Sequence, residues 1–92
     1  MKYFNWNHEK NRQLIEKRHI SFEDIIFNMQ NGHLLDDTHH ANQDKYPHQR
    51  VFVVEIDGYV YLVPYVENAN EIFLKTIIPS RKATRHYLGK AL

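Results

Sequence analysis

The spacing of apolar residues predicts a buried helix in the first third of the chain. Ser21 and Asp24 stand at capping-box spacing at its start, and Gly32 is typical of a helix end. Between them, apolar side chains recur at the i, i+3, i+4 and i+7 positions that share one face of a helix: Phe22, Ile25, Ile26 and Met29. We therefore predict that this face of the helix belongs to the core.

A short strand and a surface helix precede the core helix. Residues 2–6 alternate in the way that suits a strand with one buried face. Asn7 is a favourable N-cap for a helix that runs from about His8 to Arg18. Because Leu14 and Ile15 supply most of its apolar surface, we expect this helix to lie at the surface.

The second half of the chain has the pattern of a β-meander. Residues 50–56 and 59–66 are rich in β-branched and aromatic residues, and they flank Asp57-Gly58, a pair that favours a two-residue hairpin turn. A further strand is predicted over residues 72–78. Since Pro64 has no N–H to donate to a ladder, we expect a bulge or a sheet edge at that position.

The remaining segments complete an α+β pattern. We predict a short strand at residues 33–36, a long loop over residues 37–49, and a last helix over residues 81–88 that Ser80 caps and Gly89 ends. The order is β-α-α-β-β-β-β-α. Helices followed by a run of strands favour an α+β fold in which the two N-terminal helices pack on one face of an antiparallel sheet.

Length and composition limit the class of protein. Ninety-two residues predict a single domain over residues 1–92, with a core small enough to favour self-association or a partner chain. The absence of cysteine excludes disulfides and thiolate zinc sites. No apolar run approaches the roughly 20 residues that span a bilayer, and the N-terminus lacks the apolar region of a signal peptide. We therefore expect a cytoplasmic protein that does not enter a membrane.

Positive charge is concentrated in the last third of the chain, although the net charge is only +1. From residue 71 onward, Glu71 is the single acid among five basic residues: Lys75, Arg81, Lys82, Arg85 and Lys90. Such a cluster can bind phosphates and can stabilise the charge that develops on a phosphate under attack. Arg81 and Arg85 are four residues apart and therefore share one face of the predicted last helix.

Short motifs at both ends of the chain resemble those of BrnT-type toxins. Near the N-terminus they are Phe4-Asn5-Trp6, Lys10-Asn11 and Ser21-Phe22-Glu23, and near the C-terminus they are residues 77–84 with the following Arg85 and Tyr87. The resemblance extends over nearly the whole chain. BrnT-type proteins are small bacterial ribonucleases of type II toxin–antitoxin systems. Their fold is similar to that of RelE-like toxins, and a ribbon-helix-helix antitoxin usually neutralises them.

The resemblance implies a ribosome-independent and metal-independent endoribonuclease that needs no cofactor. Its substrate would be RNA, and an antitoxin would silence it by covering the basic surface. Cleavage of this kind uses the RNA 2′-hydroxyl as nucleophile, so the protein must supply a base, cationic donors for the phosphate and an acid for the leaving 5′-oxygen. RelE-like folds place these groups on the concave sheet face and at the neighbouring helix ends.

The candidate catalytic residues are Arg81, Arg85, Lys75 and His19. Arg81 and Arg85 take the electrostatic role because a guanidinium can contact two phosphate oxygens at once. The acid and base roles fall among His19, Lys75 and Tyr87, and the sequence does not choose between them. Further side chains are candidates for RNA binding: Lys17, Arg18, Arg50, Lys82 and Tyr87.

The chain departs from the BrnT pattern between the first two helices. The family commonly has Lys-His-Gly there, whereas this chain has Lys17-Arg18-His19. Arg18 then fills the histidine position and His19 the glycine position. Either a histidine still supplies acid–base chemistry here, or Arg18 adds a phosphate contact.

Three alternatives compete with these roles. The cations of the last helix also fit a plain solvated helix face. The alternating Tyr59, Tyr61 and Tyr65 fit either an RNA-stacking surface or a core or partner-binding stripe. A divalent metal would find imidazole and carboxylate ligands near the predicted loop, although their spacing matches no established site: His33, Asp36, Asp37, His39 and His40.

A function from a different class is also consistent with the sequence. The chain would then keep the toxin fold without catalysis and act as a binding module, either through its exposed sheet face or as a homodimer. The departure at residues 17–19 and the low net charge favour this alternative, whereas the complete motif of residues 79–85 favours the ribonuclease.

Overall fold

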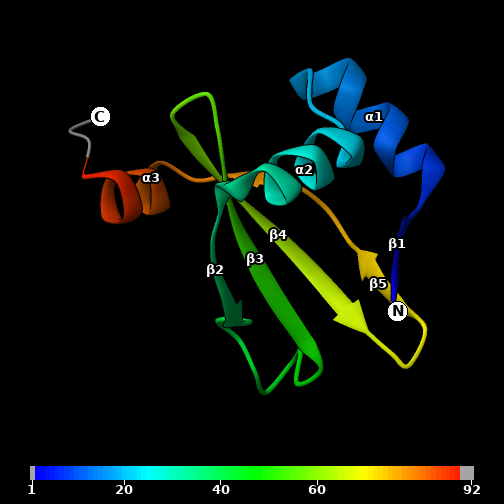
Figure 1. Cartoon of the computed structure of the whole chain (residues 1–92). Helices are drawn as coiled ribbons and strands as arrows, with labels where there is room; N and C mark the ends of the chain where they lie inside the picture. Colours follow the sequence, from blue (N-terminus) through cyan, green and yellow to red (C-terminus); the bar gives the residue numbers. More distant parts are fainter. Residues whose placement is uncertain (1, 90–92) are drawn as a thin grey trace.

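The computed structural model describes residues 2–89, over which three helices accompany one sheet (Figure 1). The helices are α1 (His8–Arg18), α2 (Phe22–Asn28) and α3 (Arg81–Leu88), and α2 continues into a wide turn, η1 (Met29–His33). The strands are β1 (Tyr3–Trp6), β2 (Leu34–His39), β3 (Gln49–Ile56), β4 (Tyr59–Glu67), β5 (Glu71–Leu74) and β6 (Ile78–Pro79). The α+β class predicted from the sequence is confirmed.

The sheet is mixed, so the prediction of a purely antiparallel sheet is wrong. Its order is β1-β5-β4-β3-β2, with β6 paired to β4, and β1 runs parallel to β5. All other pairs are antiparallel. A parallel pair needs a long crossover connection, which the helices and the meander between β1 and β5 provide. The alternation within residues 2–6 predicts a strand but carries no information about the direction of its neighbour.

The two faces of the sheet carry separate apolar clusters, because successive side chains of a strand point to opposite faces. α1 and α2 cover one face, as predicted, and the buried members of this cluster are Leu14, Ile20, Phe22, Ile25, Phe52, Val54, Val63, Tyr65, Leu74 and Ile77. On the other face, Ala83 of α3 packs with Val53 and Val60. Figure 1 shows α3 at the far end of the segment that follows β5, away from α1.

Side-chain caps begin the helices where the sequence predicts them. The Asn7 side chain accepts a hydrogen bond from the Lys10 N–H at 2.9 Å. Ser21 and Asp24 form both bonds of a capping box. The buried Asn11 joins the two helices: its Oδ1 accepts from the Phe22 N–H at 2.8 Å, and its Nδ2 donates to Glu23 at 2.8 Å. These bonds fix α1 against the start of α2.

Pro64 interrupts the ladder on one side of β4. Its carbonyl accepts a hydrogen bond from the Lys75 N–H at 2.8 Å, so its nitrogen faces the same neighbouring segment and has no proton to donate. Pairing with β5 accordingly stops at Leu74, and β6 resumes it only at Ile78. The predicted strand over residues 72–78 is therefore two short strands. Pro64 lies in β4, an inner strand of the sheet. Because Pro64 has no N–H to donate, the strand paired with β4 on that side is interrupted.

The turn between β3 and β4 agrees with the prediction from the sequence, whereas β2 is longer than predicted. Asp57 and Gly58 both have positive φ (52° and 79°), which confirms the predicted two-residue turn. β2 continues to His39, so the predicted loop over residues 37–49 is wrong at its start. The side chain of Asp37 in this extension is bonded to Arg50 and Tyr65. Such contacts from other strands do not appear in a local pattern.

Candidate functional site

A basic groove lies between the end of α1 and the segment that joins β5 to β6. It has a volume of about 200 Å³ and is lined by Lys10, Gln13, Leu14, Lys17, Arg18, Thr76 and Ile78. The guanidinium Nη1 of Arg18 donates to the carbonyl of Ile77 at 3.1 Å, which ties the end of α1 to this segment. The groove thus brings together two of the predicted RNA-binding residues, Lys17 and Arg18.

Charge in the groove is uncompensated. Elsewhere in the described residues, Arg12 pairs with Glu9 and Glu16, Lys2 with Glu67, and Arg50 with Asp37. No ion pair within residues 2–89 involves a cation of the groove. An anionic ligand would therefore meet free positive charge here.

Lys10 belongs to this groove, although we did not predict it as a site residue. The signal for it is present in the sequence. Lys10, Gln13 and Lys17 stand at i, i+3 and i+7, so they share one face of the first helix. A search for cations on that face would have found Lys10.

The second group of cations is on α3. Arg81, Lys82 and Arg85 are exposed, and none of them forms an ion pair with another described residue. Lys75, just after β5, is also exposed, and its ammonium lies 5.7 Å from the ring centre of Phe73. Lys75 is next to Thr76 of the groove. Lys90 lies outside the described residues.

Other side chains dock α3 onto the sheet, so its cations are not needed for this. Thr84 is fully buried; its hydroxyl accepts from the Val60 N–H at 2.9 Å and donates to the Ser80 carbonyl at 2.7 Å. The Ser80 N–H donates to the Val60 carbonyl at 3.0 Å. The hydroxyl of Tyr87 donates to Asp36 of β2 at 2.8 Å. These contacts fix the position of the α3 cations relative to β4.

The bond to Asp36 changes the chemistry available to Tyr87. This hydrogen bond, more than burial, raises the pKa of Tyr87 above its ordinary value. A phenol that holds its proton this way is a poor general base, and its hydroxyl is already occupied. The hydroxyl of Tyr87 thus anchors α3 to β2, and His19 and Lys75 are the remaining candidates for the general base.

His19 is separated from the basic groove, although it follows Arg18 directly in the sequence. It ends α1 in the left-handed conformation (φ 56°), and its N–H donates to the Ile15 carbonyl at 3.1 Å. This conformation is the one that glycine adopts most readily and that other residues rarely adopt. The His19 side chain lines a second cleft, between α2 and the β3–β4 turn.

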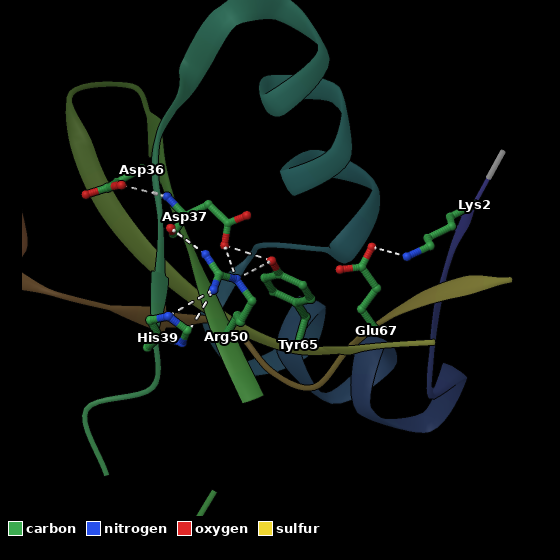
Figure 2. A network of polar contacts seen from close by, with 7 residues as sticks. All are labelled: Lys2, Asp36, Asp37, His39, Arg50, Tyr65 and Glu67. Atoms are coloured by element: carbon green, nitrogen blue, oxygen red, sulfur yellow. Dashed lines mark hydrogen bonds and ion pairs between the residues drawn. The ribbon is translucent and has the colours of Figure 1, made fainter. Parts of the chain in front are cut away.

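Arg50 does not join either group of cations; it belongs to a network that fastens β2 to β3 and β4 (Figure 2). Its Nε donates to Asp37 Oδ1 at 3.2 Å and to the Tyr65 hydroxyl oxygen at 3.3 Å, and its Nη2 donates to the Asp37 carbonyl at 3.0 Å. The Tyr65 hydroxyl donates to Asp37 Oδ1 at 2.7 Å. The charge of Arg50 is thus balanced by a carboxylate, unlike that of the groove cations.

The same network bears on the metal site considered as an alternative. Asp37 is bonded to Arg50 on the face that carries α1 and α2, whereas Asp36 is bonded to Tyr87 of α3 on the other face. The two carboxylates therefore do not converge. Within residues 2–89, no group of three or more histidine, cysteine, aspartate or glutamate side chains is placed to hold a metal ion.

The three alternating tyrosines of β4, Tyr59, Tyr61 and Tyr65, have different environments in the structure. Tyr65 is buried and stacked on Phe52, with ring centres 3.9 Å apart, so it is core. Tyr59 and Tyr61 are half-buried and line the cleft that contains His19. Only this pair remains available to a ligand.

Tyr65 gives a prediction for alkaline pH. Burial, and then the hydrogen bond to Asp37, raise the pKa of Tyr65 to about 12, against about 10 for a free tyrosine. The pKa of Tyr65 is higher in the folded protein than in the unfolded chain. The stability that Tyr65 contributes is therefore fully present below a pH of about 10 and is lost as the pH rises toward about 12. We expect the difference in ultraviolet absorbance between the wild type and Tyr65→Phe to titrate near the higher value. A difference spectrum that titrates at the ordinary value would contradict this environment for Tyr65, and the same titration in concentrated urea is the control.

Comparisons with known proteins identify no relative on which an interpretation of this chain could be based. Over the described residues, no helix has the length and apolar character needed to cross a membrane. No family model matches the sequence, and neither a curated protein nor a solved structure matches it.

Proposed function

We propose that this chain is a metal-independent endoribonuclease toxin of a type II toxin–antitoxin module, with a RelE-like fold similar to that of BrnT-type toxins. The observation that carries the proposal is the set of cations that form no ion pair within residues 2–89, in the groove at the end of α1, at Lys75 and on α3. Arg18 is bonded to Ile77, which lies in the segment that leads to α3. Several phosphates of an RNA strand would bind to these cations.

The division of labour follows from charge and position. Lys10, Lys17 and Arg18 line the groove and would hold the RNA backbone. Arg81 and Arg85 would face the phosphate under attack, where their guanidinium groups stabilise the added negative charge. The RNA 2′-hydroxyl would give its proton to a base, His19 or Lys75, and attack the adjacent phosphorus. The bond to the 5′-oxygen would break as this oxygen takes a proton from an acid, and a cyclic phosphate and a 5′-hydroxyl would result.

The proposal includes a partner and a location. An antitoxin, of the ribbon-helix-helix class in the modules that this chain resembles, would neutralise the toxin by covering the cations of the groove and of α3. Burial of this surface would exclude RNA and offset the positive charge. The protein would act in the cytoplasm, where its RNA substrate is found.

A catalytically inactive binding module is the second candidate. Two observations favour it: His19 lines a different cleft from Lys17 and Arg18, and the hydroxyl of Tyr87 is bonded to Asp36. Of the three predicted acid–base residues, this leaves only Lys75, which is next to Thr76 of the groove. Such a module would bind a protein through the same basic surface, or would associate with a second copy of itself.

Cleavage of a defined single-stranded RNA by the purified protein in EDTA distinguishes the two candidates. We expect the ribonuclease to produce fragments with 5′-hydroxyl ends, which accept a labelled phosphate from polynucleotide kinase without prior phosphatase treatment. Cleavage that disappears on chelation would contradict the metal-independent mechanism. A folded protein that leaves the RNA intact would support the binding module instead.

A further inference from the structure

An open cleft of about 510 Å³ lies on the helical side of the sheet, between α2 and the turn that joins β3 to β4. It is lined by His19, Ile20, Asp24, Phe27, Asn28, Ile56, Asp57, Tyr59 and Tyr61. These nine residues include two aspartates and no lysine or arginine. The cleft therefore differs in charge from the basic groove at the end of α1.

Both carboxylates of the cleft have free hydrogen-bonding capacity. Asp24 uses Oδ2 to accept from the Ser21 N–H at 3.0 Å, which leaves its Oδ1 available. Asp57 is exposed at the hairpin turn. No ion pair among the described residues involves either side chain. A carboxylate accepts hydrogen bonds and does not donate them, so this pair selects a ligand with several donors and a positive charge.

Aromatic rings form the other wall. Tyr59 and Tyr61 lie edge to face, with centres 5.7 Å apart and planes at 63°. Burial, followed by the electrostatic influence of Tyr59 and then of Asp57, raises the pKa of Tyr61. The faces of aromatic rings attract cations, and a guanidinium also stacks on them.

Phe27 adds an apolar rim. It leaves 65% of its side-chain surface exposed, although α2 places its other large apolar residues in or against the core. A small polyamine would satisfy the carboxylates but would leave this ring in water. A protein surface would satisfy the carboxylates and would also cover the Phe27 ring.

We propose that this cleft binds the arginine side chain of a partner protein. The planar guanidinium has donors enough to reach both aspartates while its face lies against a tyrosine, and the partner surface around it covers Phe27. RNA is the less suitable occupant, because its phosphates would be repelled by two carboxylates with no cation between them. The inference does not depend on the ribonuclease proposal, since the basic groove takes no part in it.

A pair of matched peptides tests the charge requirement. The probes are acetyl-Gly-Arg-Gly-amide and its citrulline counterpart, which keeps the shape of arginine without the charge. We expect the arginine peptide to shift the nuclear magnetic resonance signals of Phe27, Tyr59 and Tyr61, and the citrulline peptide to shift them much less. Equal shifts with both peptides would overturn the proposal. Stronger shifts of the same signals with guanosine monophosphate would overturn it in favour of a nucleobase site.

Substitutions of single carboxylates locate the site. Asp57→Asn should weaken binding of the arginine peptide by about fivefold, the upper range for an exposed ion pair. Asparagine tolerates positive φ in this type of turn, so the hairpin should persist. Asp24→Asn, which keeps an oxygen for the helix cap, should have a similar effect. Asp44→Asn removes the same charge from the loop before β3 and should change nothing; equal weakening by all three variants would mean nonspecific attraction and would overturn the proposal.

Discussion

Replacing Phe22 with alanine should lower the free energy of unfolding by about 3–5 kcal/mol, the usual cost of removing a buried phenylalanine ring. Phe22 is fully buried at the first turn of α2, and its ring stacks on Trp6 with centres 5.8 Å apart. The cluster around it joins both helices to the sheet, so the cavity cannot close without moving α2. Urea unfolding, followed by circular dichroism and by the fluorescence of Trp6, measures the change.

Phe27 supplies the matched control on the same helix. Because its ring is 65% exposed, Phe27→Ala should change the free energy of unfolding by no more than about 0.5 kcal/mol. Equal losses in the two variants would show that the buried face of α2 is assigned wrongly. Phe22→Leu, which keeps an apolar side chain, should fall between them.

The parts of the fold that the sequence predicts correctly depend on contacts between residues close in the chain. Ser21 and Asp24 cap α2, Asn7 caps α1, and Asp57-Gly58 adopts the turn that positive φ requires. Each of these structures is decided by hydrogen bonds or steric limits within four residues. Amphipathic spacing likewise identifies Phe22 as core.

The parts that the sequence does not predict depend on distant partners. β1 lies parallel to β5, 68 residues further along the chain in each register pair, and nothing in residues 2–6 specifies this neighbour. β2 extends through three further polar residues, 37–39, and two of them, Asp37 and His39, meet Arg50 from the next strand. The prediction at Pro64 is partly correct. The sequence shows that this residue has no N–H to donate, but it does not show which strand is interrupted.

The same distinction applies to the candidate site. Charge composition identifies Arg81, Arg85 and Lys75, but it does not distinguish free cations from paired ones. Arg50 is paired with Asp37 in the structure, and Lys10 lies in the groove, where its helical spacing from Lys17 would have placed it. The sequence gives no indication of the cleft that contains Asp24 and Asp57, because these two residues are 33 positions apart and come from different elements.

Replacing Arg81 and Arg85 together with alanine should reduce RNA cleavage by about 100-fold or more, because the loss of even one donor to the charged transition state commonly costs that much. The fold should persist. Both side chains are exposed, whereas Thr84, Ser80 and Tyr87 make the contacts that hold α3 to the sheet. Initial cleavage rates in EDTA, together with circular dichroism and the midpoint of thermal unfolding, separate a loss of chemistry from a loss of structure.

Two further variants identify what the arginines contribute. Arg12→Ala removes a cation that is paired with Glu9 and Glu16 on α1, so it should leave the cleavage rate nearly unchanged. Arg81→Lys with Arg85→Lys keeps both charges but loses the planar fork, so activity between the wild type and the alanine variant is expected. Full activity in the folded alanine variant would exclude α3 from the reaction and leave the groove at the end of α1 as a binding surface. A contaminating ribonuclease would cleave equally in every preparation, whereas cleavage by this chain should follow the two arginines.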